Sequence, residues 1–122
     1  MHKILVIEDN ESNMKLTVFL LENAGYTALQ ATDAELGIQI ALREQPDLIL
    51  MDVQLPGMDG LQATRIIKAN PLTKNIKIIA MTALVMAGDR EKIIEAGCNG
   101  YVPKPIQYKD FLKMISELLN KA

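Results

Sequence analysis

The chain has 122 residues, with 13 Lys and Arg against 15 Asp and Glu, which gives a net charge of -2. This length suits one domain with a buried core, and regular elements use nearly all of it, so we expect residues 1–122 to form one domain with no separate DNA-binding or catalytic unit. The interspersed charge argues against direct nucleic-acid binding, the single Cys98 excludes an internal disulfide, and no apolar window suits a signal peptide or a membrane span, so we expect a cytoplasmic protein without membrane insertion.

Strand-length and helix-length patterns alternate along the whole chain. The short runs are apolar with little polar alternation, which is typical of strands buried on both faces of a parallel sheet. The predicted elements, in chain order, are strand 4–7, helix 12–24, strand 28–31, a helix after Asp33 that ends before Pro46, strand 48–51, a helix after Asp59 that ends near Asn70, strand 78–81, helix 86–96, strand 101–102, and a last helix with Phe111, Ile115 and Leu118 on one stripe.

Residues suited to helix ends support these boundaries. Asp33 and Asp59 precede helical stretches, where a carboxylate accepts a hydrogen bond from a free backbone N–H. Gly25 and Gly97 follow helical stretches, where a left-handed backbone is often needed. Strand followed by helix, five times over, implies right-handed crossovers and a doubly wound α/β fold with helices on both faces of the sheet.

Chemically active residues follow the predicted strands. Glu8 and Asp9 follow the first, Asp52 ends the third, Thr82 ends the fourth and Lys104 follows the fifth. Since ligands in such folds bind beyond the carboxyl ends of the strands, we expect these side chains to meet at one edge of the sheet.

Three clustered carboxylates repel one another unless a cation holds them ionised. Mg²⁺ suits an open site built from a few carboxylates and phosphate oxygens. A lysine and a threonine nearby complete a set that can hold a phosphoryl group. The pattern therefore predicts Asp52 as a nucleophile that forms an aspartyl phosphate.

Four segments carry a family resemblance: ILVIEDN, PDLILMDVQLPGMDG, IIAMTA and GYVPKPI. In this order and spacing they make the whole chain resemble the response regulator receiver domains of two-component signalling. The resemblance implies a flavodoxin-like five-stranded parallel sheet in the order 2-1-3-4-5, with five flanking helices. The segments EDNESNMKL, PDLILMD, QLP and EAGC further resemble single-domain regulators of the DivK type.

The resemblance also implies roles for individual residues. Asp9, Asp52 and the backbone carbonyl of Gln54 would bind Mg²⁺ directly, and Glu8 would act through a bound water. Glu8 stands where many relatives have aspartate, which lengthens the reach to the metal and keeps the charge.

The phosphoryl group would be held by the side chains that follow the last two strands. Lys104 would contact it, aimed into the pocket by a cis bond to Pro105. Thr82 would turn inward to bond it, and Tyr101 would change rotamer with Thr82.

The function implied is a phosphorylation switch and not a conventional enzyme. A histidine kinase or a phosphotransfer protein would supply the phosphoryl group, and the chain would promote its own phosphorylation and dephosphorylation. The altered surface of the fourth helix, fifth strand and fifth helix would bind a downstream protein. Leu84, Val85 and Met86 are a candidate apolar patch beside it, and Gln54 and Leu84 would tune hydrolysis.

Simpler explanations exist for each residue. Acids at a helix start favour its dipole, and threonine is common in strands. We favour the site because an ionised Asp52 behind four apolar residues is costly without a partner.

Three other functions were weighed against the switch. A flavodoxin-like cofactor site would need a Ser, Thr and Gly loop where Glu8 and Asp9 stand. A haloacid dehalogenase-type phosphatase would need an acid where Gln54 stands. A degenerate receiver that acts without phosphorylation would not need the complete chemical set.

Overall fold

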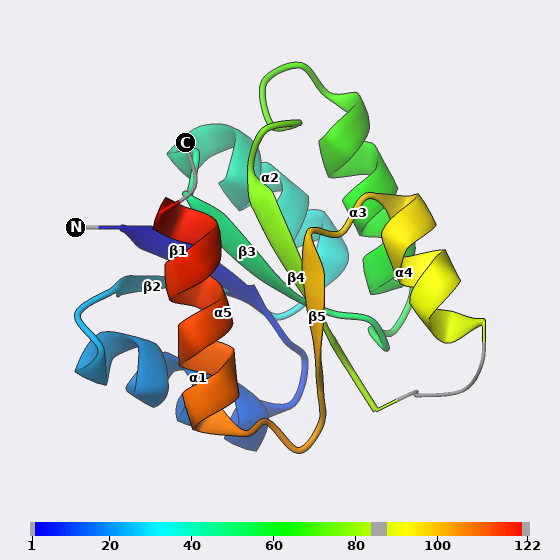
Figure 1. The fold of residues 1–122 in the computed structure, drawn as a ribbon. Coiled ribbons are helices and arrows are strands. Elements are labelled where there is room, and N and C mark those ends of the chain that lie inside the picture. The colour runs from blue at the N-terminus through cyan, green and yellow to red at the C-terminus, as the bar shows by residue number, and fades with distance from the viewer. Residues whose placement is uncertain (1, 84–87, 121–122) are drawn as a thin grey trace.

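The structure is a computed structural model that describes residues 2–83 and 88–120. Strands and helices alternate as the sequence predicts (Figure 1). The elements are β1 (Lys3–Ile7), α1 (Glu11–Asn23), β2 (Thr27–Ala31), α2 (Ala34–Glu44), β3 (Leu48–Asp52), α3 (Gly60–Ala69), β4 (Lys77–Thr82), α4 (Asp89–Ala96), β5 (Gly100–Pro103) and α5 (Tyr108–Asn120).

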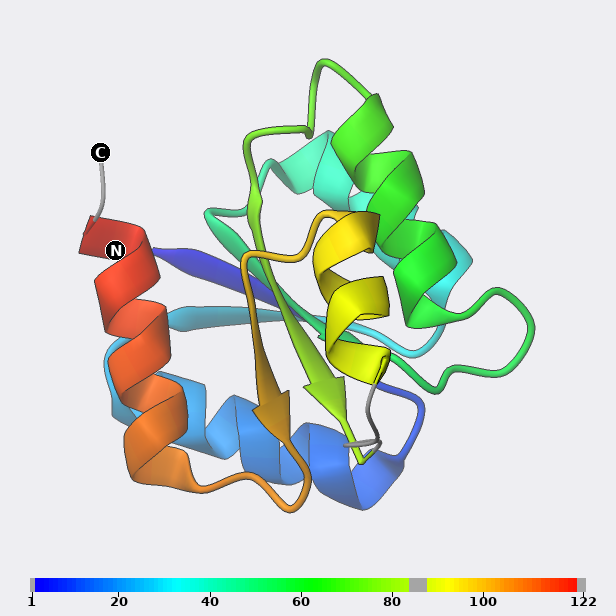
Figure 2. The same cartoon turned by 45° about the vertical axis from the view of Figure 1, so that its right-hand side comes forward.

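All strand pairs in the sheet are parallel, in the order β2-β1-β3-β4-β5. This confirms the predicted flavodoxin-like order. Every residue of the central strand β3 is buried, whereas the edge strand β2 has exposed positions. Helices α1 and α5 lie on one side of the sheet, and α2, α3 and α4 lie on the other (Figures 1 and 2).

Alternate residues of one strand serve the two faces of the sheet. Ile4 and Val6 of β1 pack in the same cluster as Phe111 of α5, with further residues of α1. Leu5 and Ile7 pack with residues of α2 and α3. Side chains on a strand alternate in direction, so a strand that is apolar throughout is what two covered faces require.

Capping residues set the helix boundaries. Asp33 and Asp59 accept hydrogen bonds from the backbone N–H groups of Leu36 and Gln62, each at 2.8 Å, as predicted. Asn10, which the sequence analysis did not single out, accepts a hydrogen bond from the Asn13 N–H and starts α1 one residue earlier than predicted.

Two glycines end helices in the left-handed conformation that was expected. Gly25 has φ 93° after α1, and Gly97 has φ 107° at the end of α4. Helix α4 begins at Asp89 instead of residue 86, and the predicted patch of Leu84, Val85 and Met86 lies outside the described residues. No helix in the described part of the chain has the length and hydropathy needed to cross a membrane.

Candidate functional site

The carboxyl ends of β1, β3, β4 and β5 meet at one edge of the sheet. Asp52 and Thr82 are the last residues of β3 and β4, one residue further along than predicted for each strand. The backbone continues the sheet past these ends: Val53 N–H donates to the Met81 carbonyl at 3.0 Å, and Lys104 N–H donates to the Thr82 carbonyl at 2.9 Å. The predicted convergence at this edge is therefore observed.

Three carboxylates form an acid cluster at this edge. One oxygen from each of Glu8, Asp9 and Asp52 lies within 4.8 Å of the others. Asp9 is exposed, whereas Glu8 is 1% exposed and Asp52 is 3% exposed. Burying two carboxylates beside a third is costly unless cations balance their charge.

Lys104 supplies part of that balance. Its Nζ lies 3.2 Å from Glu8 Oε1 and 3.2 Å from Asp52 Oδ2. The Lys104–Pro105 peptide bond is cis, as the resemblance implied. Among the described residues, this is the one ammonium paired with the acid cluster, so negative charge remains in excess there.

The electrostatics of Glu8 and Lys104 reflect this excess. Burial, a hydrogen bond to Asp52 and the charge of Asp52 raise the pKa of Glu8 to about 7, against the opposing effects of the Asn10 N–H and Lys104. For Lys104, burial acts to lower the pKa, but the neighbouring charges of Asp52 and Glu8 outweigh it and raise the pKa overall. Without another cation, Glu8 therefore retains a proton near neutral pH.

Close packing behind Asp52 holds its carboxylate in place. The Gln54 N–H donates to Asp52 Oδ1 at 3.0 Å, and the Gly60 N–H donates to the Val53 carbonyl at 3.0 Å. A Cβ on Gly60 would overlap the backbone carbonyl of Asp52. The sequence analysis missed Gly60, although a glycine directly after the helix cap Asp59 is a signal that a backbone approaches closely there.

The predicted switch residues lie on the α4 side of the site. Thr82 is 1% exposed and lines a cavity of about 350 Å³ together with Gln54 and residues of α3 and α4. Tyr101 pairs with Ala80 in the sheet, two residues before the end of β4, so it lies outside the acid cluster. The Arg90 guanidinium lies 5.6 Å from the centre of the Tyr101 ring, a contact the sequence did not indicate.

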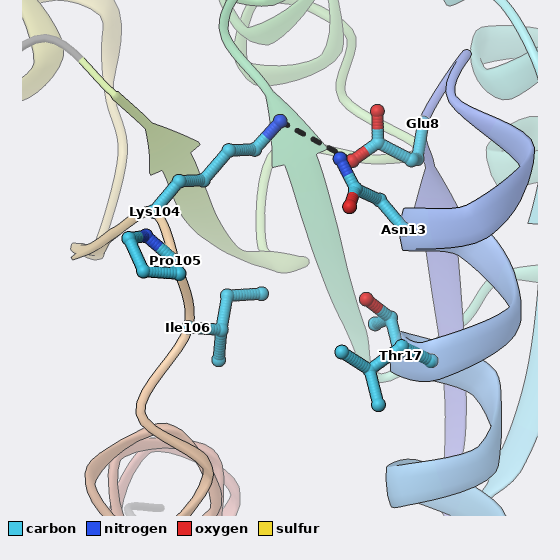
Figure 3. A pocket seen from close by; sticks show the side chains of 7 residues that line it. Glu8, Asn13, Thr17, Lys104, Pro105 and Ile106 are labelled. Carbon is cyan, nitrogen blue, oxygen red and sulfur yellow. Dashed lines mark hydrogen bonds and ion pairs between the residues drawn. The ribbon is translucent and has the colours of Figure 1, made fainter.

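A second cavity lies on the other side, between α1 and the segment that joins β5 to α5 (Figure 3). Its volume is about 380 Å³. It is lined by Glu8, Asn13, Leu16, Thr17, Lys104, Pro105 and Ile106. Asn13 and Thr17 were not predicted as site residues.

Together these groups suit phosphoryl chemistry. Clustered carboxylate oxygens match the ligands that Mg²⁺ prefers, and an adjacent ammonium and hydroxyl can contact phosphoryl oxygens. The fit rests on the excess of negative charge over the single paired ammonium.

Comparison with known proteins identifies the family. The response regulator receiver domain family matches residues 4–116. The chain belongs to this family. A relative from Brucella anthropi, the polar-differentiation response regulator DivK, is 40% identical over 119 residues, which cover 98% of this receiver and 97% of that protein.

Solved structures agree with this assignment. The receiver domain of the sensor histidine kinase PA1611 from Pseudomonas aeruginosa PAO1, solved with magnesium coordinated in its active site cleft, superposes with a TM-score of 0.92 at 34% identity over 98% of each chain. A receiver domain protein from Methanospirillum hungatei JF-1 superposes with a TM-score of 0.89 at 29% identity, covering 98% of this chain and 94% of that one.

The family assignment decides between the functions weighed from the sequence. Receiver domains are phosphorylation-dependent signalling switches that bind Mg²⁺ at an acidic pocket, and this receiver is similar to DivK. The cofactor-binding and phosphatase alternatives are therefore set aside.

Proposed function

We propose that Asp52 accepts a phosphoryl group from the phosphohistidine of a histidine kinase or a phosphotransfer protein. The observation that carries this is the buried Asp52 carboxylate, which lies beside two further acids and 3.2 Å from the Lys104 ammonium. An Asp52 oxygen attacks phosphorus, the P–N bond breaks, and its electron pair stays on the imidazole nitrogen.

Mg²⁺ would be held by Asp9, Asp52 and the backbone carbonyl of Gln54, with Glu8 acting through a bound water. When bound, the ion neutralises charge on the phosphoryl oxygens. Lys104 contacts a further oxygen, and Thr82 donates its hydroxyl to the remaining one. These roles follow the order of the strand ends and the closeness of the three acids.

The phosphoryl group changes the surface through Thr82 and Tyr101. It adds roughly two negative charges and strong acceptors, which draw Thr82 inward. Tyr101 changes rotamer in step, and a downstream protein binds the altered α4–β5–α5 surface. The receiver also hydrolyses its own aspartyl phosphate, and in no other respect acts as an enzyme.

The receiver is proposed to act as one unit over residues 1–122, without binding nucleic acid or entering a membrane. We place it in the cytoplasm, where histidine kinases present their phosphoryl groups.

Phosphorylation of the purified protein tests this proposal. Incubation with Mg²⁺ and acetyl phosphate should raise the intact mass by one phosphoryl group, and Asp52→Asn should abolish the gain. Asp110→Asn, which removes an exposed acid in the first turn of α5, is the matched control and should label normally. Labelling that survives Asp52→Asn would place the acceptor elsewhere, and no labelling of the unaltered protein would favour a degenerate receiver.

A further inference from the structure

The cavity between α1 and the segment from Lys104 to Ile106 opens directly beside the acid cluster. Glu8 and Lys104 belong both to its lining and to the phosphoryl site, and Lys104 contacts Asp52 at 3.2 Å. Figure 3 shows this pair at one end of the cavity, with Asn13 and Thr17 on one side and Pro105 and Ile106 on the other. A group that enters the cavity therefore lies next to the reacting carboxylate.

Thr17 is unusual among the buried threonines. It is 2% exposed and stands on the buried stripe of α1 between Met14 and Leu21, where an apolar residue would be expected. The buried Thr64 and Thr73 donate to backbone carbonyls at 2.8 and 2.7 Å. Within residues 2–83 and 88–120 the Thr17 hydroxyl has no such partner, and in Figure 3 it faces the cavity. A buried hydroxyl without a protein partner is suited to a ligand.

The rest of the lining gives the cavity two kinds of wall. Asn13 lies one helical turn before Thr17, so that an amide and a hydroxyl share one side. Leu16, which is 54% exposed, Pro105 and Ile106 supply apolar contacts. A small flat ring with a polar edge matches this combination better than a charged or a purely apolar group.

We propose that this cavity is the leaving-group subsite, which binds the imidazole ring of an N-phosphorylated donor during transfer to Asp52. This inference rests on the proposed function of Asp52. The Asp52 oxygen forms the new O–P bond as the P–N bond breaks, and the P–N electron pair remains on the departing nitrogen. The second ring nitrogen already carries a proton, so the ring leaves as neutral imidazole, and its N–H donates to Thr17 Oγ1 or to the Asn13 amide oxygen.

Three small donors separate ring recognition from the transfer itself. Phosphoimidazole carries the ring, phosphoramidate has a P–N bond without a ring, and acetyl phosphate has neither. Asp52 phosphorylation is followed by intact mass with Mg²⁺ present. Thr17→Val should slow the reaction with phosphoimidazole by roughly threefold to tenfold, the effect of one hydrogen bond, and leave the other two donors unchanged. Asn13→Ala should act in the same direction.

Two further variants guard against a structural explanation. Thr17→Ser retains the hydroxyl and should keep the rate with phosphoimidazole. Ser12→Ala lies on the exposed part of α1 and should change nothing. Acetyl phosphate serves as an internal reference, because a misfolded site would slow all donors alike.

The possible results separate the two proposals. Equal slowing with all three donors, or no slowing with phosphoimidazole, overturns the subsite and leaves Asp52 as the acceptor. Failure of every donor to label the unaltered protein overturns the acceptor proposal, and the subsite with it.

Discussion

Two half-buried lysines lie at opposite ends of the sheet and show how the same residue type serves different purposes. At the amino end, Lys68 Nζ donates to the Ile76 carbonyl at 2.7 Å, to the Lys74 carbonyl at 3.3 Å and to Asn99 Oδ1 at 3.1 Å. At the carboxyl end, Lys104 Nζ contacts only carboxylates, from Glu8 and Asp52, among the described residues.

The partners give the two lysines opposite pKa shifts. Burial and the charge of Lys77 lower the pKa of Lys68, which is surrounded by neutral acceptors. Burial also acts to lower the pKa of Lys104, but the charges of Asp52 and Glu8 raise it overall. Neutral acceptors around Lys68 complete a loop connection, whereas the carboxylates at Lys104 exceed its charge and leave a site that needs a further cation. The difference indicates which end of the sheet carries the chemistry.

Replacing each lysine by methionine is the strongest way to break this comparison. Lys104→Met should slow phosphorylation of Asp52 by roughly tenfold to 100-fold, because a preorganised charge at the phosphoryl oxygens is lost. Lys68→Met should leave the rate within about twofold, since it removes no group from the site. Rates come from intact mass with acetyl phosphate and Mg²⁺. Equal slowing in both variants would contradict the division between the two ends.

Gly60→Ala tests whether packing behind Asp52 maintains the carboxyl end. The new Cβ would overlap the Asp52 carbonyl, so we expect a loss of about 2 kcal/mol in the free energy of unfolding, within the range for overpacked sites. Gln62→Ala, on the exposed side of the same helix, is the control and should cost less than about 0.5 kcal/mol. Urea denaturation measures both, and a neutral Gly60→Ala would show that the backbone can move apart without penalty.

The stability cost of Lys68→Met sharpens the other half of the comparison. It leaves the carbonyl acceptors of the loop before β4 without their donor, so we expect a loss of about 1–2 kcal/mol. The aliphatic stem, which packs beside Gly97, is largely retained in methionine. Unfolding should respond in the same way with and without Mg²⁺, and any dependence on Mg²⁺ would contradict a purely structural role.

The pH dependence of Mg²⁺ binding is expected to be the smallest effect. Because the pKa of Glu8 is raised to about 7 in the folded protein from 4.5, the protonated group stabilises the metal-free fold at low pH, and this stabilisation is lost as the pH rises through about 7. Mg²⁺ binding should weaken below about pH 7, because the proton competes with the ion. Calorimetric titrations of the unaltered protein and Glu8→Gln compare the two, and a pH profile that Glu8→Gln leaves unchanged would assign the proton to another group.

Sequence and structure agree most closely where chemistry dictates residue types. Asp52 and Lys104 could be predicted because a carboxylate behind an apolar strand and a lysine beside a proline are unusual in themselves and occur at strand ends. The parallel sheet followed from unbroken apolar runs. These signals are local, so they survive without coordinates.

What the sequence could not show depends on contacts between distant segments. Thr17 appears as one polar position on a helical stripe, and its hydroxyl gains meaning only beside Ile106 and Lys104. Lys68 and Lys104 are equivalent as letters, because their acceptors come from other elements. Gly60 was missed for the same reason, since its role is the approach of the Asp52 backbone.

A magnesium titration followed by amide NMR of isotope-labelled protein tests the central claim most directly. The account predicts saturable shifts that begin at Glu8, Asp9, Gln54 and Lys104, with little change around Lys68 and Asn99 at the opposite end of the sheet. Asp52→Asn should weaken this response strongly. A folded protein whose spectrum ignores Mg²⁺, or whose shifts appear first around Lys68, would contradict it.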